Sequence, residues 1–330
     1  MPRYYITGGR QRKGAKGHIE WFSYGLAMIV EVDTESGATR EVMSYETPAP
    51  YRPDDPKSNV VFKAGTRRDD TLIVCTQTEI LDISLPDFRI ARHVSHPWLN
   101  DVHHVMRTDD GNYLVADTGL DIVLLLTPDG RILREWAALP EENPWTRFDR
   151  DTDYRKVVTT KPHHCHPNYV FQADGEFWVT RFVQRDAFCL TRPERPPLAI
   201  GLQKPHDGVV IGREVYFTTV DGHVVVCSLD TGEQRAVYDL NEYTTGDKAL
   251  GWCRGLFVLD ARRVIVGFSR LRPSKFRENL DWLKHKIGSQ PIAGHRPTRI
   301  ACYDLAGGGL EWEIDLEPIG CNAVFSILPS

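Results

Sequence analysis

Apolar residues occur along the chain in runs of four to seven, and nearly every run is bounded by Gly, Asp or Pro. The runs are rich in Val, Ile, Leu, Tyr and Phe, which β-strands favour. Repeatedly, one run ends in an Asp-x-Gly or Gly-rich turn and a second, more amphipathic run follows, as in a β-hairpin. Clear cases begin at Gly25, Asn112, Glu214 and Thr298. The pattern predicts an all-β protein built from hairpins.

The hairpins follow an internal repeat when they are aligned by the apolar strand that precedes each one. Six repeat starts emerge, namely SNVVFKA from Ser58, NDVHHVMR from Asn100, HPNYVFQ from His166, HDGVVI from His206, CRGLFVL from Cys253 and CNAVFSI from Cys321. A further strand follows each of the first five starts, in order TLIVCT, NYLVAD, EFWVTR, EVYFTT and RVIVGFS. The sixth start has no strand after it, because the sequence ends at Ser330.

These repeats predict a six-bladed β-propeller in one domain, residues 1–330. The N-terminal strands YYITG and GLAMIVEVD would supply what the sixth start lacks, so the C-terminal strand completes the N-terminal blade and closes the ring. A division into two domains near residue 155 is the alternative, but no linker rich in Pro, Ser or Gly interrupts the repeat. Insertions at about 137–162 and 269–297 are expected over the channel mouth. The second contains FRENLDWLKHKIG, which has the period of a short amphipathic helix.

Composition narrows the classes of partner. The formal net charge is −5 and the pI is about 6.2, so no global positive field attracts nucleic acid or an anionic membrane. The sequence shows no signal peptide and no apolar run of membrane-spanning length, which indicates a soluble, cytoplasmic protein. The seven cysteines are odd in number and mostly lie in apolar runs, which indicates buried thiols rather than a disulfide scaffold.

Histidines gather at the predicted inner strands. Half of the 12 histidines belong to three consecutive repeat starts or the residues just before them, and these are His103, His104, His163, His164, His166 and His206. Inner strands line the channel of a propeller, so these imidazoles should converge at one end of the axis. Three neutral imidazoles and an open position form a catalytic metal site. We favour His104, His166 and His206 as ligands of a divalent transition metal, with Fe, Zn and Mn all suitable.

Some of these assignments stay open. Alternation along the strand turns either His103 or His104 to the channel, and a bulge of one or two residues would decide which. His163 and His164 are a substrate contact and a further candidate ligand, or ordinary loop residues. Cys165 and Cys253 are thiolate ligands or buried thiols, and Cys253 is also placed to contact substrate.

Charged and phenolic residues supply the remaining candidates. Arg254 begins an inner strand, where its guanidinium can clamp a carboxylate, sulfate or phosphate. Tyr154 and Arg155, on the first insertion, are candidates for proton transfer and anion stabilisation. Arg270 and Arg272 belong to the basic second insertion, which is a lid for an anionic substrate or a solvated loop. The sequence contains no GxGxxG after a strand, GxxxxGK[ST], GxSxG or HExxH motif, so nucleotide-binding, serine-hydrolase and zincin chemistry have no support.

The repeat NDVHHVMRTDDGNYLVADTGLDIVLLLTPDGRILREW resembles a blade of six-bladed propeller enzymes, a group that includes arylsulfotransferases, NHL-repeat proteins, the peptidyl-hydroxyglycine amidating lyase, gluconolactonases and strictosidine synthases. The resemblance to the amidating lyase implies zinc held by one histidine from each of three blades, with Tyr and Arg nearby. The matching residues here are His104, His166, His206, Tyr154 and either Arg254 or Arg155. The resemblance to arylsulfotransferases implies instead a nucleophilic histidine, His104 or His206, beside Arg254.

The sequence therefore predicts a metal-dependent enzyme, a lyase, hydrolase, isomerase or oxygenase, acting on a small anionic molecule in the channel. Two alternatives are a non-catalytic propeller that binds a protein partner and a metal-free enzyme that transfers a group through a histidine nucleophile.

Overall fold

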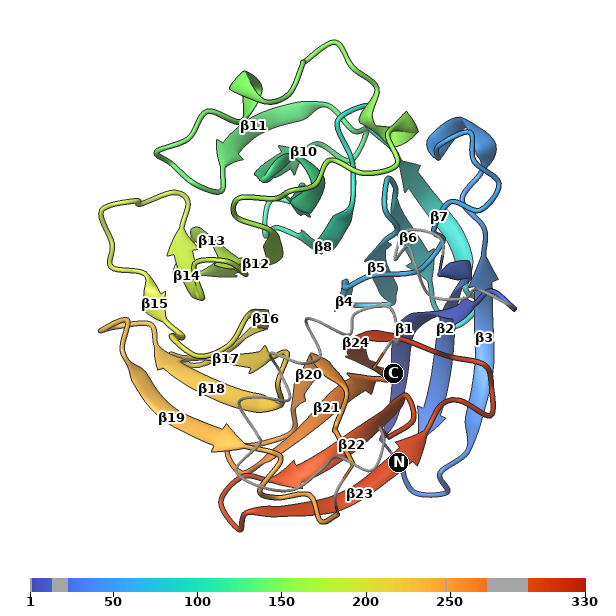
Figure 1. Ribbon diagram of the computed structural model, residues 1–330, viewed down its shortest axis with the longest axis vertical. Helices are drawn as coiled ribbons and strands as arrows, with labels where there is room; N and C mark the ends of the chain where they lie inside the picture. Colours follow the sequence, from blue (N-terminus) through green and yellow to red (C-terminus); the bar gives the residue numbers. More distant parts are fainter. Residues whose placement is uncertain (1, 14–22, 247, 272–295) are drawn as a thin grey trace.

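The strands of the protein surround a central axis. The computed structural model describes residues 2–13, 23–246, 248–271 and 296–330. Its strands form six antiparallel four-stranded sheets, arranged as the blades of a ring (Figure 1). The predicted six-bladed all-β propeller is confirmed.

The four strands of each blade follow one another from the channel outward. Blade 1 is β24 (Val324–Pro329), β1 (Arg3–Gln11), β2 (Tyr24–Asp33) and β3 (Thr39–Tyr45); blade 2 is β4 (Thr66–Arg68), β5 (Thr71–Cys75), β6 (Ile80–Ser84) and β7 (Arg89–Val94). Blade 3 is β8 (Val102–Arg107), β9 (Tyr113–Asp117), β10 (Ile122–Leu126) and β11 (Ile132–Ala137); blade 4 is β12 (Pro167–Ala173), β13 (Glu176–Arg181), β14 (Asp186–Cys189) and β15 (Leu198–Ala199). Blade 5 is β16 (Pro205–Ile211), β17 (Glu214–Thr219), β18 (His223–Ser228) and β19 (Gln234–Asp239); blade 6 is β20 (Trp252–Val258), β21 (Arg263–Ser269), β22 (Arg299–Asp304) and β23 (Gly309–Asp315).

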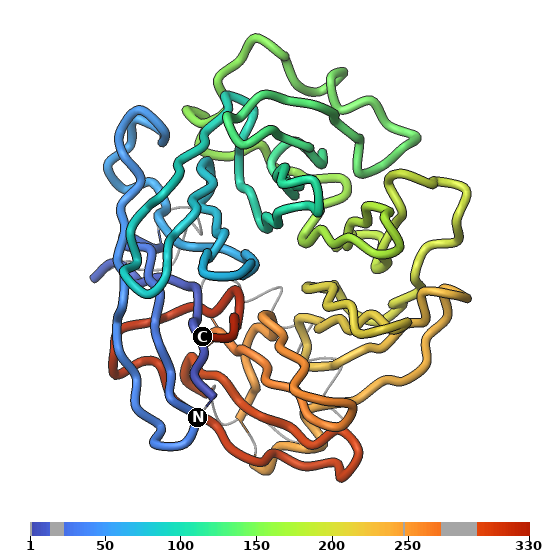
Figure 2. The backbone as a smooth tube through the Cα atoms, turned by 180° about the vertical axis from the view of Figure 1, so that it is seen from behind, coloured from blue at the N-terminus to red at the C-terminus, as the bar shows by residue number. Residues whose placement is uncertain are grey.

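The two ends of the chain close the ring. β24 pairs antiparallel with β1, with Tyr4 opposite Pro329 and Ile6 opposite Ile327. The C-terminal strand is thereby the inner strand of the blade that the N-terminus builds, and both termini lie in that blade when the ring is seen from behind (Figure 2). The closure predicted from the unpaired sixth repeat is confirmed, because β24 pairs with the inner edge of β1.

The apolar cores lie between the blades. Six clusters of buried side chains each join two neighbouring sheets, so that every one of the six blade interfaces has its own core. Middle strands such as β5 and β10 are buried on both faces, which explains their nearly continuous apolar runs. Outer strands such as β7 are mostly exposed, and their sequences are correspondingly polar.

Short 3₁₀ turns occupy parts of the connections, namely η2 (Ala49–Tyr51), η3 (Thr118–Leu120), η4 (Pro144–Thr146) and η5 (Tyr154–Lys156). The last two lie in the first predicted insertion. Side-chain caps start both turns, because Asn143 accepts a hydrogen bond from Trp145 N–H and Asp153 accepts one from Arg155 N–H. Most of the second insertion, including the predicted amphipathic helix, lies outside the described residues.

Candidate functional site

Bulges at the start of the inner strands determine which side chains reach the channel. Five inner strands have one residue more than the strand they pair with. The extra residue is His103 in β8, Asn168 in β12 and Phe325 in β24. In β16 it lies between His206 and Val209, and in β20 it lies between Cys253 and Leu256. A bulge leaves the extra residue unpaired and redirects its side chain. The repeated bulge therefore turns one side chain of each of these blades toward the axis of the ring.

The bulge residues meet in a small cavity of about 10 Å³ on the axis. Its lining includes Ala64, His103, Asn168, Asp207, Arg254 and Phe325. This set contains one residue from the start of each blade, so the cavity forms only when the ring closes.

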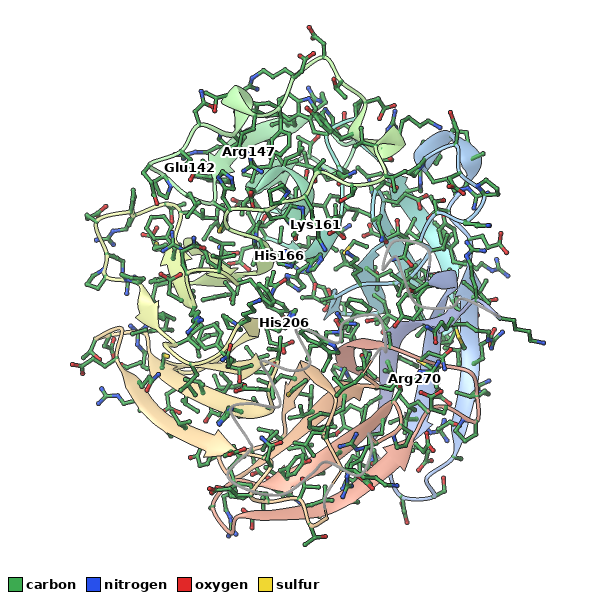
Figure 3. The ribbon with its side chains drawn as sticks, in the orientation of Figure 1. Glu142, Arg147, Lys161, His166, His206 and Arg270 are labelled. Atoms are coloured by element: carbon green, nitrogen blue, oxygen red, sulfur yellow. The ribbon has the colours of Figure 1, made fainter. Side chains whose placement is uncertain are left out.

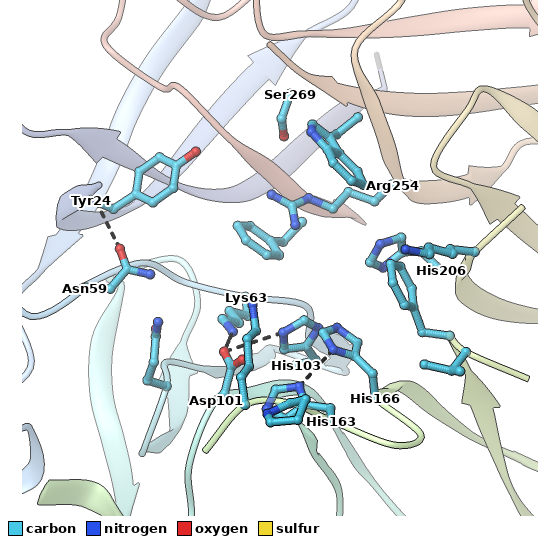
Figure 4. Close-up of a pocket in the computed structure, with 18 residues that line it drawn as sticks. Tyr24, Asn59, Lys63, Asp101, His103, His163, His166, His206, Arg254 and Ser269 are labelled. Carbon is cyan, nitrogen blue, oxygen red and sulfur yellow. Dashed lines mark hydrogen bonds and ion pairs between the residues drawn. The ribbon is translucent and has the colours of Figure 1, made fainter. Parts of the chain in front are cut away.

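A larger cavity of about 330 Å³ adjoins the small cavity, and the two share His103, His206, Arg254 and Phe325 in their linings. All six blades or the segments leading into them contribute (Figure 4). The lining residues are Tyr24, Asn59, Lys63, Gln77, Asp101, His103, Lys161, Pro162, His163, His166, Phe182, Val183, Lys204, His206, Trp252, Arg254, Ser269 and Phe325. We call this cavity the channel pocket. Its described lining residues include four imidazoles, four cationic side chains and the carboxylate of Asp101.

The loop that carries the histidine cluster is held by one buried carboxylate. Asp121 accepts hydrogen bonds from the backbone N–H groups of His164 (2.8 Å), Cys165 (3.1 Å) and His166 (2.7 Å). Arg147 pairs with the same carboxylate at 2.9 Å. His166 has a φ of 60°, a left-handed conformation that is uncommon outside glycine. Asp121 thus fixes an irregular turn that directs His163 and His166 into the channel pocket.

Hydrogen bonds assign the proton positions of His163 and His166. The Thr160 hydroxyl donates to Gly119 O (2.5 Å), so its oxygen is the acceptor for His163 Nε2–H at 3.3 Å. His163 Nδ1 is then unprotonated and accepts from His166 Nδ1–H, since the two atoms lie 3.0 Å apart. In the neutral pair, His166 Nε2 is left as the basic atom.

His103 is oriented by the same logic. The Asn168 amide nitrogen donates to Pro205 O (2.8 Å), so its oxygen faces His103 Nδ1 at 2.8 Å and accepts the proton there. His103 Nε2 is therefore the basic atom, 3.5 Å from an Asp101 carboxylate oxygen. The rings of His103 and His166 meet edge to face with centroids 4.8 Å apart. Two basic nitrogens are thus presented by neighbouring imidazoles.

Burial keeps these imidazoles neutral near pH 7. It lowers the pKa of His103 to about 4, lowers the pKa of His166 well below its usual range, and lowers that of His163. Burial would raise the pKa of Asp101, but the ammonium group of Lys63, in direct contact, holds it well below its usual value. The pocket wall therefore presents neutral bases beside a buried Lys–Asp ion pair.

A cationic wall faces the imidazoles. The Arg254 guanidinium stacks 3.5 Å from the Phe325 ring centroid and donates from Nε to Val324 O at 2.8 Å. Lys204 lies 5.1 Å from the centroid of Phe182. His166 and His206 lie near the centre of the ring (Figure 3), and the Phe182 ring contacts both, with centroid separations of 4.6 and 5.6 Å.

The structure reverses the expected roles of His103 and His104. His104 is 0% exposed, stacks on Tyr169 with a centroid distance of 3.5 Å, and accepts from Val170 N–H through Nδ1. It does not line the channel pocket, so the preference for His104 as the channel residue is wrong. The bulge at His103 is the reason, because one extra residue exchanges the faces of the strand.

Several other predicted residues lie away from the channel pocket. His164 points outward and pairs with Glu142 at 2.6 Å. Tyr154 is buried in the core between blades 2 and 3, where its hydroxyl accepts from Asp149 N–H. Arg155 makes a two-bond ion pair with Asp153. None of the three can touch a molecule in the channel pocket.

The remaining predicted residues also lie away from the channel pocket or outside the described residues. Cys253 and Cys165 are fully buried thiols whose pKa burial raises well above the usual value, as the buried-thiol alternative expected. Arg270 contacts Gln11 and pairs with Glu317 at 3.3 Å, outside the channel pocket. Arg272 lies outside the described residues.

The described residues do not fit the three-histidine metal site. No group of three or more His, Cys, Asp or Glu within the described ranges has the geometry to hold a metal ion. His104 is turned into the core, and the Phe182 ring packs against both His166 and His206. The lone pair of His163 Nδ1 is engaged by His166. We therefore derive no chemical step through a metal.

The sequence reasoning missed Lys63, Gln77, Asn168, Phe182 and Lys204 as lining residues. Asn168 is a bulge residue inside one repeat start and Lys63 lies near the end of another, so both belong to the segments that the repeat alignment identifies. The other three lie in or next to turns at the channel end of their blades, outside the repeat, and only ring closure brings them together.

Fold and site together define a six-bladed β-propeller with a polar pocket at the centre of its ring. No protein-family model and no curated protein matches the sequence. Among solved structures, a protein of unknown function from Bacteroides caccae superposes over 100% of this chain and 99% of its own, with a TM-score of 0.63 and 13% identity. A chain of a nidogen/laminin complex superposes over 99% and 98%, with a TM-score of 0.56 and 9% identity. At these identities the likeness shows the fold alone, and it does not select one of the propeller enzyme families that the repeats resemble.

No helix in the described part of the chain has both the length and the apolar character needed to cross a membrane.

Proposed function

We propose that this protein is an enzyme that binds a small anionic molecule in the channel pocket and transfers a proton through His166 and His103. One observation carries the proposal, which is that four imidazoles and four cationic side chains of the described residues converge around a cavity of about 330 Å³. A cavity of this size is at the lower end for small-molecule sites, which run from about 300 to 1,000 Å³.

The positive side of the channel pocket selects the charge of the substrate. Among the described lining residues, Lys63 is paired with Asp101, and Lys161, Lys204 and Arg254 are further cationic side chains. A guanidinium held by stacking on Phe325 and by a backbone carbonyl is preorganised for a carboxylate, sulfate or phosphate.

The imidazole side supplies the acid–base chemistry. His166 Nε2 stands at the end of an oriented chain from Gly119 O through Thr160 and His163. It can accept a proton from an anion bound against Arg254 and return it at a second position. This is the chemistry of a lyase or isomerase step. His103, whose Nε2 lies 3.5 Å from the Asp101 carboxylate, is the second group able to take a proton.

The first test measures binding and proton transfer separately. Thermal shift and calorimetry with sodium sulfate, sodium phosphate and C2–C6 carboxylates at constant ionic strength identify an anion that binds. NMR in D₂O then detects exchange of its carbon-bound hydrogens. Arg254→Gln and Lys204→Gln should each weaken binding at least about tenfold, whereas Arg89→Gln, whose side chain is 82% exposed, should not.

His166→Asn tests the base. Asn tolerates the positive φ and can still donate to His163, so binding should stay within about threefold while exchange falls by about 100-fold or more. His164→Asn, in the same loop but facing outward, is the matched control and should exchange like the wild type. Binding without exchange in the wild type would support a non-catalytic propeller instead. Stoichiometric metal in the purified protein that is lost in His166→Asn would instead support the metal-dependent enzyme predicted from the sequence.

A further inference from the structure

Lys63 is a buried lysine in the lining of the channel pocket. It lies in the segment that leads into β4, where its backbone N–H donates to Cys75 O at 2.8 Å. The next residue, Ala64, donates from its N–H to His103 O at 3.0 Å, so the backbone on both sides of the ring channel is tied together here. The Lys63 side chain is 5% exposed. Lysine is almost never this buried without a partner, which makes the surroundings of its amine informative.

A single carboxylate oxygen joins Lys63 to a histidine. Asp101 Oδ1 contacts Lys63 Nζ and lies 3.5 Å from His103 Nε2 (Figure 4). Asp101 is itself buried and has a φ of 50°, which is uncommon for a residue other than glycine. The amine, the carboxylate and the basic nitrogen of His103 therefore form a row along which a proton can pass.

The electrostatic surroundings make the neutral amine more accessible than it is in water. Burial lowers the pKa of Lys63 and outweighs the contact with Asp101, which raises it. The Arg254 guanidinium lowers the pKa further. A lysine that is desolvated and close to another cation is an activated nucleophile.

A purely structural ion pair accounts less well for this arrangement. Taking two charges out of water costs about as much as their attraction returns, so a buried pair adds little net stability. Lys63 and Asp101 also border a cavity of about 330 Å³ lined by further cations and imidazoles, rather than packed apolar side chains. The surroundings suit a reactive amine that meets an anionic ligand.

We propose that Lys63 is a nucleophile that forms an imine with a carbonyl group of the ligand, so that the small anion of the proposed function is an oxo acid. The choice of an acid rests on the proposed function, because its carboxylate is the group held at Lys204 and Arg254. An iminium group withdraws electrons from the neighbouring carbon, so a hydrogen there becomes acidic enough for a neutral imidazole such as His166 to remove.

The step balances without an oxidant or a reductant. Lys63 gives one proton to Asp101, and its nitrogen lone pair forms a C–N bond as the C=O π electrons move to oxygen. Asp101 passes that proton to the oxygen, takes a second proton from nitrogen and passes it to the hydroxyl, which leaves as water when the C=N bond forms. The ammonium and the ketone thus become an iminium ion and water. Asp101 can act in this way because its pKa is held low by the ammonium charge, which is lost when Lys63 gives up its proton.

Reductive trapping tests the imine directly. The wild-type protein is incubated near neutral pH with pyruvate or 2-oxobutyrate and sodium cyanoborohydride, which reduces the iminium to a stable secondary amine. Intact-mass spectrometry should show up to about one adduct per chain, and peptide fragmentation should locate it on Lys63. An adduct spread over surface lysines, or located on Lys161 or Lys204, would contradict the proposal.

Variants separate the amine from the charge. Lys63→Arg keeps a positive partner for Asp101 but has no amine able to form an imine, so it should lower the trapped adduct by at least about tenfold. Lys57→Arg, at an exposed lysine earlier in the same connection, is the matched control and should be trapped like the wild type. If Lys63→Arg does not fold, the location of the adduct in the wild type decides.

The outcomes also distinguish this inference from the proposed function. If oxo acids bind in an Arg254-dependent way but no adduct forms on Lys63, the inference is wrong and the proposed function stands. If no anion binds, the proposed function fails, and trapping with the neutral ketone hydroxyacetone then tests the amine alone. An adduct on Lys63 would support the nucleophile with an uncharged carbonyl ligand, and the absence of an adduct would overturn the inference as well.

Discussion

At the scale of single residues, burial determines what each histidine does. His104 and His103 are adjacent in sequence, yet one is enclosed by Tyr169 and blade 4 and the other lines the channel pocket. The distinction could not be read from the sequence, because both residues are histidine and the bulge that separates them depends on the neighbouring strand.

His104 should make the protein sensitive to acid. Burial lowers its pKa from 6.5 to about 3, so the native state keeps it neutral while the unfolded state binds a proton below about pH 6.5. The stability that comes from the neutral ring is complete above pH 6.5 and is lost progressively toward pH 3.

We expect the contribution of His104 to fall by about 2 kcal/mol between pH 8 and pH 5. His104→Asn keeps an acceptor for Val170 N–H but does not titrate. Urea unfolding at the two pH values should show the pH-dependent loss of stability reduced by about that amount in the variant. An unchanged loss would mean that His104 is not the group responsible.

At the scale of elements, the sequence was most informative about strands and closure. The sequence alone shows the alternation of apolar and polar residues and the turn residues, because these depend on local chemistry. It also shows the unpaired last repeat, which predicts closure because strand edges need partners. The inner-strand bulges were less visible, because they become defined only when two strands pair. The bulge falls at different positions of the starts, at the third residue for Asn168 but at the fourth for His103 and the fifth for Phe325, so the repeat alignment gave no common signal for it.

The joint between β1 and β24 offers a direct test of ring closure. A Cβ added at Gly8 would lie 1.9 Å from the carbonyl oxygen of Ala323, which is backbone and cannot swing aside. Gly8→Ala should therefore displace β24 and lower the free energy of unfolding by about 1–3 kcal/mol. Gly309→Ala, where no atom lies within 4 Å, should change it by less than about 0.5 kcal/mol. Equal effects in denaturant titrations would contradict a tight joint at this position.

At the scale of the whole molecule, ring closure creates the site. Lys63 and Asp101 come from segments that lead into neighbouring blades, and Arg254 comes from the other side of the ring, so no single blade contains the pocket. The charge of the pocket is also a property of the whole ring, because different blades place neutral imidazoles beside cationic side chains that would attract an anion.

Anion binding should therefore be coupled to proton uptake. A bound negative charge stabilises imidazolium and raises the pKa of His103 above the value of about 4 in the free protein. Affinity should then decrease as pH rises from 4 toward 7, because protonation favours the complex in that window. Calorimetry in Bis-Tris and imidazole buffers should report uptake of up to about one proton. The uptake should vanish in the double variant His103→Asn/His166→Asn, and binding enthalpies independent of the buffer would argue against the coupling.

The sequence by itself determined the all-β architecture, the six repeats and the closure of the ring, because alternating burial, turn chemistry and unpaired edges are properties of local stretches. Only the tertiary structure decided that His103 rather than His104 faces the channel, since a bulge of one residue moves a side chain to the other face of a strand. The tertiary structure also brought Lys63, Gln77 and Lys204 to one cavity. Lys63 and Gln77 lie in segments of blade 2 and Lys204 lies in the segment that leads into blade 5, and the distance between these segments is set by packing of the whole ring.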